Sequence, residues 1–231
     1  MKNLSVTAAI VIAAVGVAAG FVGYKLLPDT HQATARVLVD RSAAPSSAPE
    51  TSPEAAPVPE LVPEIHMPDL QGKQRTLAEF AGQPRIINFW ATWCGPCRRE
   101  IPLLNALQHS HRQEKLQIIG IAVDFEKAVQ EYVKKTHIDY PVLIGEDAGL
   151  DAAQKFGISD LVLPFSVFVD ASNRVVAVKI GELHQPEVAF ILLSIAQLDA
   201  GKSSLQDTRA AIQAELRNEA QQRAQAPAPA T

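Results

Sequence analysis

Two cysteines separated by two residues are the part of this sequence best suited to chemistry. They lie in the segment Trp93-Cys94-Gly95-Pro96-Cys97, and the chain has no other cysteine. At positions i and i+3 of a helix, two side chains share one face with their Cβ atoms about 5 to 6 Å apart, close enough for a disulfide to form with modest adjustment. The spacing therefore indicates one local dithiol that can be oxidised and reduced.

The two thiols are expected to differ because a helix should begin between them. Cys94 precedes the first turn and faces the unpaired N–H groups and the positive end of the helix dipole, which stabilise a thiolate relative to a thiol. Cys97 lies inside that turn and is expected to be the more buried, resolving thiol. Pro96 costs little there because a first-turn N–H has no partner within the helix.

The elements that must position this dithiol alternate between strands and helices. Buried strands are predicted at 85–90, 116–124 and 141–144, a hairpin at 165–170 and 174–180, and two short strands within 65–77. Helices are predicted from the cysteine segment to about 111, at 125–136, at 150–156, from about 186 to 200 and from about 204 to 223. Because strands alternate with helices and end in a hairpin, we predict an α/β fold with a central mixed sheet flanked by helices.

The beginning of the chain predicts export. Residues 4–24 contain no Asp, Glu, Lys, Arg or His, and a helix of this length spans about 30 Å, the thickness of the hydrocarbon layer of a bilayer. We therefore predict that residues 1–27 form a transmembrane anchor. A cleaved signal peptide is the alternative, with Lys2 as its positive region and small residues at 18–20 near a cleavage site.

Composition divides the remainder of the chain into three parts. Residues 28–63 are rich in Ala, Ser, Pro and Glu, which predicts a disordered linker that extends on the order of 100 Å. Its role is either that of a filler or that of a tether that lets a catalyst reach several partners. Residues 64–199 carry the alternating pattern of one domain, and residues 200–231 form a C-terminal helix and a frayed tail.

Composition also excludes some functions. The 231 residues include 21 Lys and Arg against 25 Asp and Glu, a formal net charge of −4, so a nucleic acid is not an expected partner. Two cysteines are too few for a disulfide scaffold or for a four-cysteine metal site.

The segment IINFWATWCGPCRREIPLL at 86–104 resembles the thioredoxin superfamily, specifically the TlpA/ResA-like membrane-anchored thiol–disulfide oxidoreductases. The resemblance covers about 64–199 and implies a thioredoxin-like fold. It also implies that Cys94 is the exposed nucleophile, that Cys97 resolves the mixed disulfide, and that Pro164 is a cis-proline facing the dithiol. Trp93, Gly95 and Pro96 then flank the redox-active disulfide. The sequence around Pro164 is Leu-Val-Leu-Pro-Phe, more apolar than the family pattern, so its substrate groove should be bulkier and more apolar.

Glu100 follows Cys97 by one helical turn. By the resemblance it exchanges a proton with the resolving thiol, and the alternative is a solvated carboxylate that only favours the helix dipole. Asn88 stands where cytoplasmic thioredoxins have a buried Asp, which leaves Glu100 as the candidate proton carrier. Arg98 and Arg99 either lower the pKa of the thiolate or are simply solvated.

The predicted function is an extracytoplasmic protein-disulfide reductase in the periplasm, either attached to the inner membrane or soluble after signal cleavage. The expected partners are disulfide-containing client proteins, such as apocytochromes c or copper-site proteins. The resemblance implies a transmembrane thiol transporter of the DsbD/CcdA kind as electron donor. No cofactor and no metal are expected.

Two other functions remain open. A soft-metal carrier for copper would use Cys94 and Cys97 as ligands, but His109 and His111 point away from each other on a helix and supply no convincing third ligand. A thiol-based interaction module would use the linker and the last helix instead.

Overall fold

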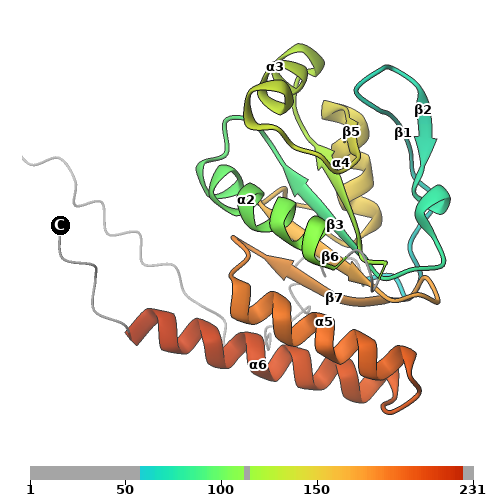
Figure 1. Ribbon diagram of the computed structural model, residues 1–231, viewed down its shortest axis with the longest axis vertical. Coiled ribbons are helices and arrows are strands. Elements are labelled where there is room, and N and C mark those ends of the chain that lie inside the picture. The colour runs from blue at the N-terminus through green and yellow to red at the C-terminus, as the bar shows by residue number, and fades with distance from the viewer. Residues whose placement is uncertain (1–57, 112–114, 226–231) are drawn as a thin grey trace, which may run out of the picture. The chain divides into compact units, whose positions relative to one another are not determined.

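The computed structural model describes residues 58–111 and 115–225 (Figure 1). The predicted anchor or signal peptide at 1–27 lies outside these residues, as does most of the predicted linker. Among the helices that the structure does describe, none combines the length and the apolar character needed to cross a membrane.

The core of the molecule is a five-stranded mixed sheet. Its strands lie in the order β5 (Val142–Ile144), β4 (Gln117–Ala122), β3 (Arg85–Trp90), β6 (Phe165–Val169) and β7 (Val175–Ile180). β3 runs parallel to β4 and antiparallel to β6, which confirms the predicted mixed sheet. Every residue of β3 is buried, as its short apolar sequence indicates for a central strand.

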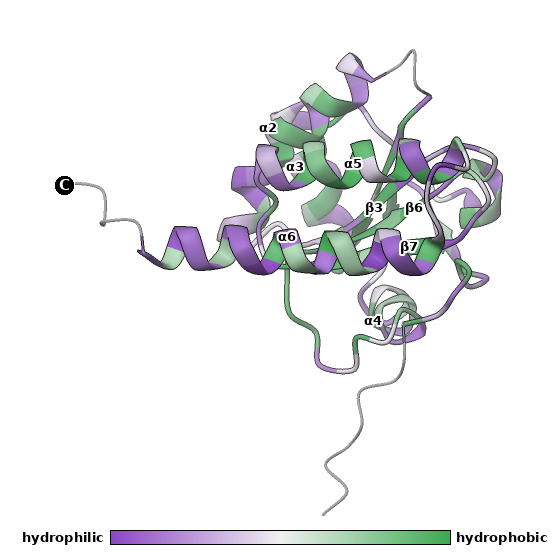
Figure 2. Ribbon diagram, turned by 90° about the horizontal axis from the view of Figure 1, so that it is seen from below, coloured by the Kyte–Doolittle hydropathy of each residue, from purple (hydrophilic) through white to green (hydrophobic). Residues whose placement is uncertain are grey.

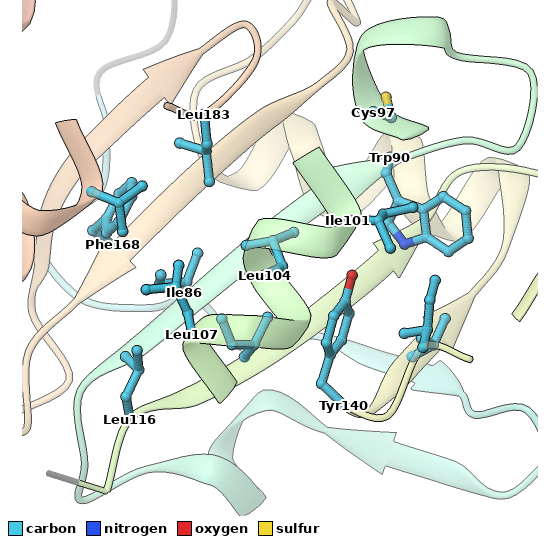
Figure 3. Packing of buried hydrophobic residues seen from close by; sticks show 14 of the residues in the cluster. Ile86, Trp90, Cys97, Ile101, Leu104, Leu107, Leu116, Tyr140, Phe168 and Leu183 are labelled. Carbon is cyan, nitrogen blue, oxygen red and sulfur yellow. The ribbon is translucent and has the colours of Figure 1, made fainter. Parts of the chain in front are cut away.

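Helices cover both faces of this sheet (Figure 1). Apolar side chains from α2 (Gly95–Ser110), α3 (Glu126–Thr136) and α5 (Gln185–Asp199) pack on one face, and those of α4 (Glu146–Lys155) pack on the other. Figure 3 shows the first of these layers, with Ile101 and Leu104 of α2 lying over β3. Burying such side chains contributes roughly 1.5–3 kcal/mol each, so α2 is held firmly at the end of β3.

A small hairpin packs on the same side of the sheet as α4. Its strands, β1 (His66–Pro68) and β2 (Gln74–Thr76), are antiparallel, and a 3-10 helix, η1 (Leu77–Phe80), follows them. The two short strands predicted within 65–77 are therefore confirmed, and in the turn between them Asp69 accepts backbone N–H bonds from Gln71 and Lys73.

The fourth helix begins earlier than predicted. α4 begins at Glu146, whereas the apolar pattern indicated a start near 150. Its first turn is acidic, with Glu146 and Asp147, and carboxylates at a helix start are stabilised by the dipole without contributing to an apolar pattern. Gly157 follows the helix in a left-handed conformation, φ +85°, as expected for a residue after a helix end.

The folded domain begins before Glu64. Val175 donates its N–H to the carbonyl of Glu60 at 2.8 Å, and Val62 donates to the carbonyl of Asn173 at 3.1 Å. Leu61 forms a β-bridge with Arg174 between these two bonds. Residues 60–62, which composition assigned to the linker, are therefore paired with the β6–β7 hairpin.

The last helix, α6 (Leu205–Gln225), contacts α5 and β7. Most of its residues are hydrophilic (Figure 2), and its two buried side chains are Thr208 and Ile212. Arg209 adds a polar anchor, because its Nε donates to the carbonyl of Val175 at 3.1 Å. The apolar stripe of this helix is therefore thin, and its buried residues hold the first half of the helix against α5 and β7.

Candidate active site

The two cysteines lie at the start of α2, joined by a disulfide with a Cα–Cα distance of 5.3 Å. Cys94 is the N-cap residue, with extended backbone angles, and its Sγ accepts the N–H of Cys97 at 3.2 Å. Such an N–H group, together with the helix dipole, stabilises negative charge on the sulfur at this position. On reduction, Cys94 is therefore the sulfur that the local backbone favours as a thiolate.

The burial of the pair corrects one expectation. Cys97 is fully buried, but Cys94 is only 5% exposed, so its description as an exposed nucleophile is wrong for the oxidised pair. The physical reason is that Sγ of Cys94 is bonded to the buried Cys97 and turned toward the first helical turn. The neighbouring Trp93, by contrast, is 67% exposed. Figure 3 shows Cys97 at the beginning of α2, near Trp90 of β3.

Glu100 lies one turn beyond Cys97 and is 1% exposed, which excludes a solvated first-turn carboxylate. Its Oε1 accepts a hydrogen bond from Nδ2 of Asn88 at 2.7 Å, and its Oε2 accepts one from the N–H of Leu183 at 2.7 Å. Burial raises the pKa of Glu100 from 4.5 to about 7, although these two hydrogen bonds oppose the change. Glu100 can therefore both take up and release a proton near neutral pH.

Two strands position the Glu100 carboxyl. Asn88 of β3 and Ser166 of β6 are partners in the antiparallel register, and Nδ2 of Asn88 also donates to Oγ of Ser166 at 3.0 Å. The Oδ1 atom of Asn88 is buried and has no hydrogen-bond partner among the described residues. Sequence reasoning missed Ser166 and the amide of Leu183. A serine within an otherwise apolar strand was the one available signal, since a backbone amide leaves none.

Pro164 lies at the same end of the sheet as the dithiol. The Leu163–Pro164 peptide bond is cis. β6 begins at the next residue, Phe165, which pairs with Phe89 near the end of β3, so Pro164 is level with the segment that leads into Cys94. Pro164 is 70 residues from Cys94 along the chain, and the register brings it to the end of the sheet at which α2 starts.

The surface around this end of the sheet, which we call the rim, is partly apolar. Trp93 and Phe125 are each 67% exposed, and Val162 is 50% exposed. Phe125 is held beside the cysteine segment because Asp124, which precedes it, accepts hydrogen bonds from the N–H and the hydroxyl of Thr92 at 2.9 and 2.5 Å. Exposed side chains of this size beside a redox centre suit contact with another polypeptide.

The two arginines after Cys97 have different surroundings. Arg99 donates to the carboxylate of Glu182 from Nε at 2.9 Å and from Nη2 at 2.5 Å. Its charge is therefore directed to Glu182 rather than to a thiolate. Arg98 is exposed.

In the described part of the chain, no group of three or more His, Cys, Asp or Glu side chains is placed to hold an ion. The only thiols of the chain, those of Cys94 and Cys97, are bonded to each other.

Comparisons with known proteins agree with a dithiol site. The AhpC/TSA family matches residues 58–178. The thiol-disulfide oxidoreductase ResA of Bacillus thuringiensis subsp. konkukian (strain 97-27) is 32% identical over 128 residues, covering 55% of this chain and 72% of that protein. ResA of Bacillus anthracis is likewise 32% identical over 128 residues, with the same coverage.

Solved structures give the same result for the fold. A secreted thiol-disulfide isomerase from Corynebacterium glutamicum superposes with a TM-score of 0.52 and 26% identity, over 58% of this chain and 84% of that chain. A DsbF homologue from Corynebacterium diphtheriae superposes with a TM-score of 0.51 and 25% identity, over 61% of this chain and 87% of that chain.

Proposed function

The chain belongs to the AhpC/TSA family and is a thiol–disulfide oxidoreductase of the ResA/TlpA-like kind, and from this premise we propose that it reduces protein disulfides outside the cytoplasm. The observation that supports this most directly is the Cys94–Cys97 pair at the start of α2, with the buried carboxyl of Glu100 one turn away. A nucleophilic sulfur, a resolving sulfur and a proton acceptor are the three groups that the reaction needs.

The reaction begins from the reduced pair. The thiolate of Cys94 attacks one sulfur of a client disulfide, a mixed disulfide forms, and the other client sulfur leaves as a thiolate that takes a proton from solvent. Cys97 then loses its proton to Glu100 and attacks Sγ of Cys94. This second step forms the Cys94–Cys97 disulfide and releases the second client sulfur, so two electrons have moved from the protein to the client.

Pro164 and the apolar rim serve to bind the client. Pro164 lies directly before β6, at the end of the sheet that carries the dithiol, where an extended segment of the client can lie against it. Trp93, Phe125 and Val162 provide exposed apolar contact around that edge. We therefore propose that clients present an unfolded or flexible segment with apolar side chains next to their disulfide.

We place the domain on the outer side of the inner membrane. Residues 1–27 act as the anchor, residues 28 to about 57 as the tether, and the helix after residue 200 as part of the folded unit. The apolar sequence at 4–24 supports this location, as does the similarity to an isomerase described as secreted. A signal peptide that is cleaved would leave the same domain soluble in the periplasm.

A reductase in an oxidising compartment needs a supply of electrons. We propose a membrane thiol transporter of the DsbD/CcdA kind, which would reduce Cys94–Cys97 after each turnover. The clients that fit this role are proteins whose own thiols must be reduced before they bind haem or copper, such as apocytochromes c.

Cysteine variants test the enzymatic role. Replacing Cys97 with Ser in the full chain should trap mixed disulfides with clients, because the resolving sulfur is gone, and replacing Cys94 with Ser should trap none. Full function of Cys94→Ser in vivo would instead favour an interaction module.

The redox potential tests the direction of electron flow. A reductase should lie near thioredoxin, about −270 mV, whereas a value near that of the oxidant DsbA, about −120 mV, would overturn the reductase assignment.

A further inference from the structure

The carboxylate of Glu187, in the first turn of α5, is fully buried and has three partners. Nη2 of Arg223 lies 2.6 Å from its Oε1, the N–H of His184 donates to its Oε2 at 3.2 Å, and Nζ of Lys179 lies 3.7 Å from Oε2. A buried carboxylate needs such partners because desolvation otherwise disfavours its charge. Arg223 comes from the last turn of α6, so the C-terminal helix supplies the closest cation.

The same region also reaches the dithiol site. Residues 181–184 connect β7 to α5, and Glu187 holds the C-terminal end of this segment by accepting the N–H of His184. Within them, the N–H of Leu183 holds Oε2 of Glu100 at 2.7 Å, and the carbonyl of Glu182 accepts a hydrogen bond from Nζ of Lys179 at 3.3 Å. One short segment thus has Glu187 on one side and Glu100 on the other.

We propose that Arg223 is a positioning residue for the dithiol site: by pairing with Glu187 it fixes residues 181–184, and with them the amide that orients the Glu100 carboxyl. This inference rests on the proposed function, in which Glu100 receives the proton of Cys97. It assigns a role to α6 beyond the attachment of the helix to the domain, to which Ile212 and Arg209 contribute.

The direction in which loss of Arg223 changes the pKa of Glu100 follows from Lys179. Without Arg223, Lys179 is the remaining cation within 4 Å of the buried Glu187 carboxylate, and we expect its Nζ to move toward that carboxylate and away from the carbonyl of Glu182. Lys179 is a cation that lowers the pKa of Glu100, so its withdrawal raises that pKa. The hydrogen bond from Leu183, which also lowers it, weakens when residues 181–184 are released.

The groups that face Glu100 from the surrounding elements leave this sign unchanged. Glu182 raises the pKa of Glu100, and Lys179 lowers it. Tyr140, which precedes β5, interacts electrostatically with Glu100 but is itself neutral, since burial raises its pKa far above the physiological range. Cys97, on the same helix as Glu100, does not titrate in the oxidised protein.

The test uses the oxidised full chain and the titration of the Glu100 carboxyl carbon, followed by NMR and assigned with Glu100→Gln. Arg223→Gln should raise the titration midpoint by about half to one pH unit. Arg217→Gln is the matched control, because Arg217 is exposed on the same helix and has no ion pair among the described residues. An unchanged midpoint in Arg223→Gln, or an equal change in Arg217→Gln, would overturn the proposal.

Two further variants guard against loss of folding. Glu187→Gln removes the carboxylate through which Arg223 is proposed to act, so adding Arg223→Gln to Glu187→Gln should leave the midpoint unchanged from that of Glu187→Gln alone. Arg223→Lys retains the charge and should return the midpoint most of the way to the wild-type value. If Arg223→Gln alone does not fold, a difference in midpoint between Glu187→Gln and the double variant Glu187→Gln/Arg223→Gln still overturns the inference.

The proposed function fails in a different way. If Glu100→Gln leaves the pH dependence of thiol exchange by the reduced protein unchanged, Glu100 is not the proton acceptor, whatever its titration shows. If Glu100→Gln changes that dependence and Arg223→Gln changes neither it nor the midpoint, only the positioning role of Arg223 is wrong.

Discussion

Replacing Glu100 with Gln should stabilise the oxidised protein in a pH-dependent way. The carboxyl has a pKa of 4.5 in its ordinary state and about 7 in the folded protein, because burial disfavours its charged form. Between these values the folded chain keeps a proton that the unfolded chain has lost. The folded state is therefore at its full stability below about pH 4.5 and loses stability as the pH rises to about 7.

The size of the effect follows from that rise in pKa. Moving from 4.5 to about 7 corresponds to about 3 kcal/mol of free energy of unfolding, fully lost above about pH 7. A neutral amide escapes this loss and keeps the hydrogen bonds. Its oxygen can accept from the N–H of Leu183, and its NH₂ group can donate to Oδ1 of Asn88 if the Asn88 amide turns over. Oδ1 of Asn88 has no partner in the described residues, and the hydroxyl of Ser166 can then donate to it as well.

Urea unfolding of oxidised wild type and Glu100→Gln from pH 4 to 9 measures this difference. We expect the variant to gain on the wild type from about pH 4.5 upward, by about 3 kcal/mol in total, with a constant difference above about pH 8. The control is Glu131→Gln, which removes an exposed carboxylate from α3 and should change stability by less than about 0.5 kcal/mol. A difference between wild type and Glu100→Gln that stays constant from pH 5 to 8 would refute the assignment of a buried, proton-binding carboxyl.

Two further predictions concern the core and the rim. Gly120→Ala should lower the free energy of unfolding, measured by urea unfolding, by about 1–3 kcal/mol. The new Cβ would lie 2.9 Å from Nε1 of the fully buried Trp90 and 3.2 Å from Cε2 of Tyr140. An unchanged urea midpoint would show that the core can accommodate this methyl group without cost. Val162→Ser should raise KM for disulfide peptides with apolar flanking residues. Because Val162 is 50% exposed, kcat and stability should be nearly unchanged. Equal KM values for the wild type and the variant would show that Val162 is not part of the client-binding surface.

The strands and most helices were predictable because their signals are local. The apolar run of β3 predicts a central strand buried on both faces, and the acidic first turn of α4 explains why the start of that helix was misplaced. Residues 60–62 were assigned to the linker because their neighbours are rich in proline, and nothing in their own sequence indicates that they pair with the β6–β7 hairpin. Backbone pairing of such a short segment depends on the partner strand rather than on the segment.

The candidate site was predictable only in part, for the same reason. The spacing of Cys94 and Cys97 identifies a dithiol within four consecutive residues. The environment of Glu100, by contrast, is assembled from Asn88 on β3 and from Leu183, which lies 83 residues after Glu100 in the sequence. The sequence spacing indicated that Glu100 lies beside Cys97, but it did not show whether Glu100 is buried. Only the packing of α2 and of residues 181–184 against the sheet decides that the carboxyl is desolvated.

The dithiol and Glu100 are both buried because α2 packs against the sheet, and this burial affects both proton transfer and access to the dithiol. Both lie on the face of α2 that packs against the sheet, so water is largely excluded from Cys97 and from the carboxyl that would take its proton. A carboxyl with an ordinary pKa would be a poor proton acceptor for a thiol, whereas one near 7 matches it more closely and still releases the proton at neutral pH. In the proposed reaction, a client approaches the dithiol over the rim formed by Trp93, Phe125 and Val162, whose side chains are exposed. In this proposal, client binding at the rim and proton transfer to Glu100 depend on different residues, so Val162→Ser should alter KM and Glu100→Gln should alter the pH dependence.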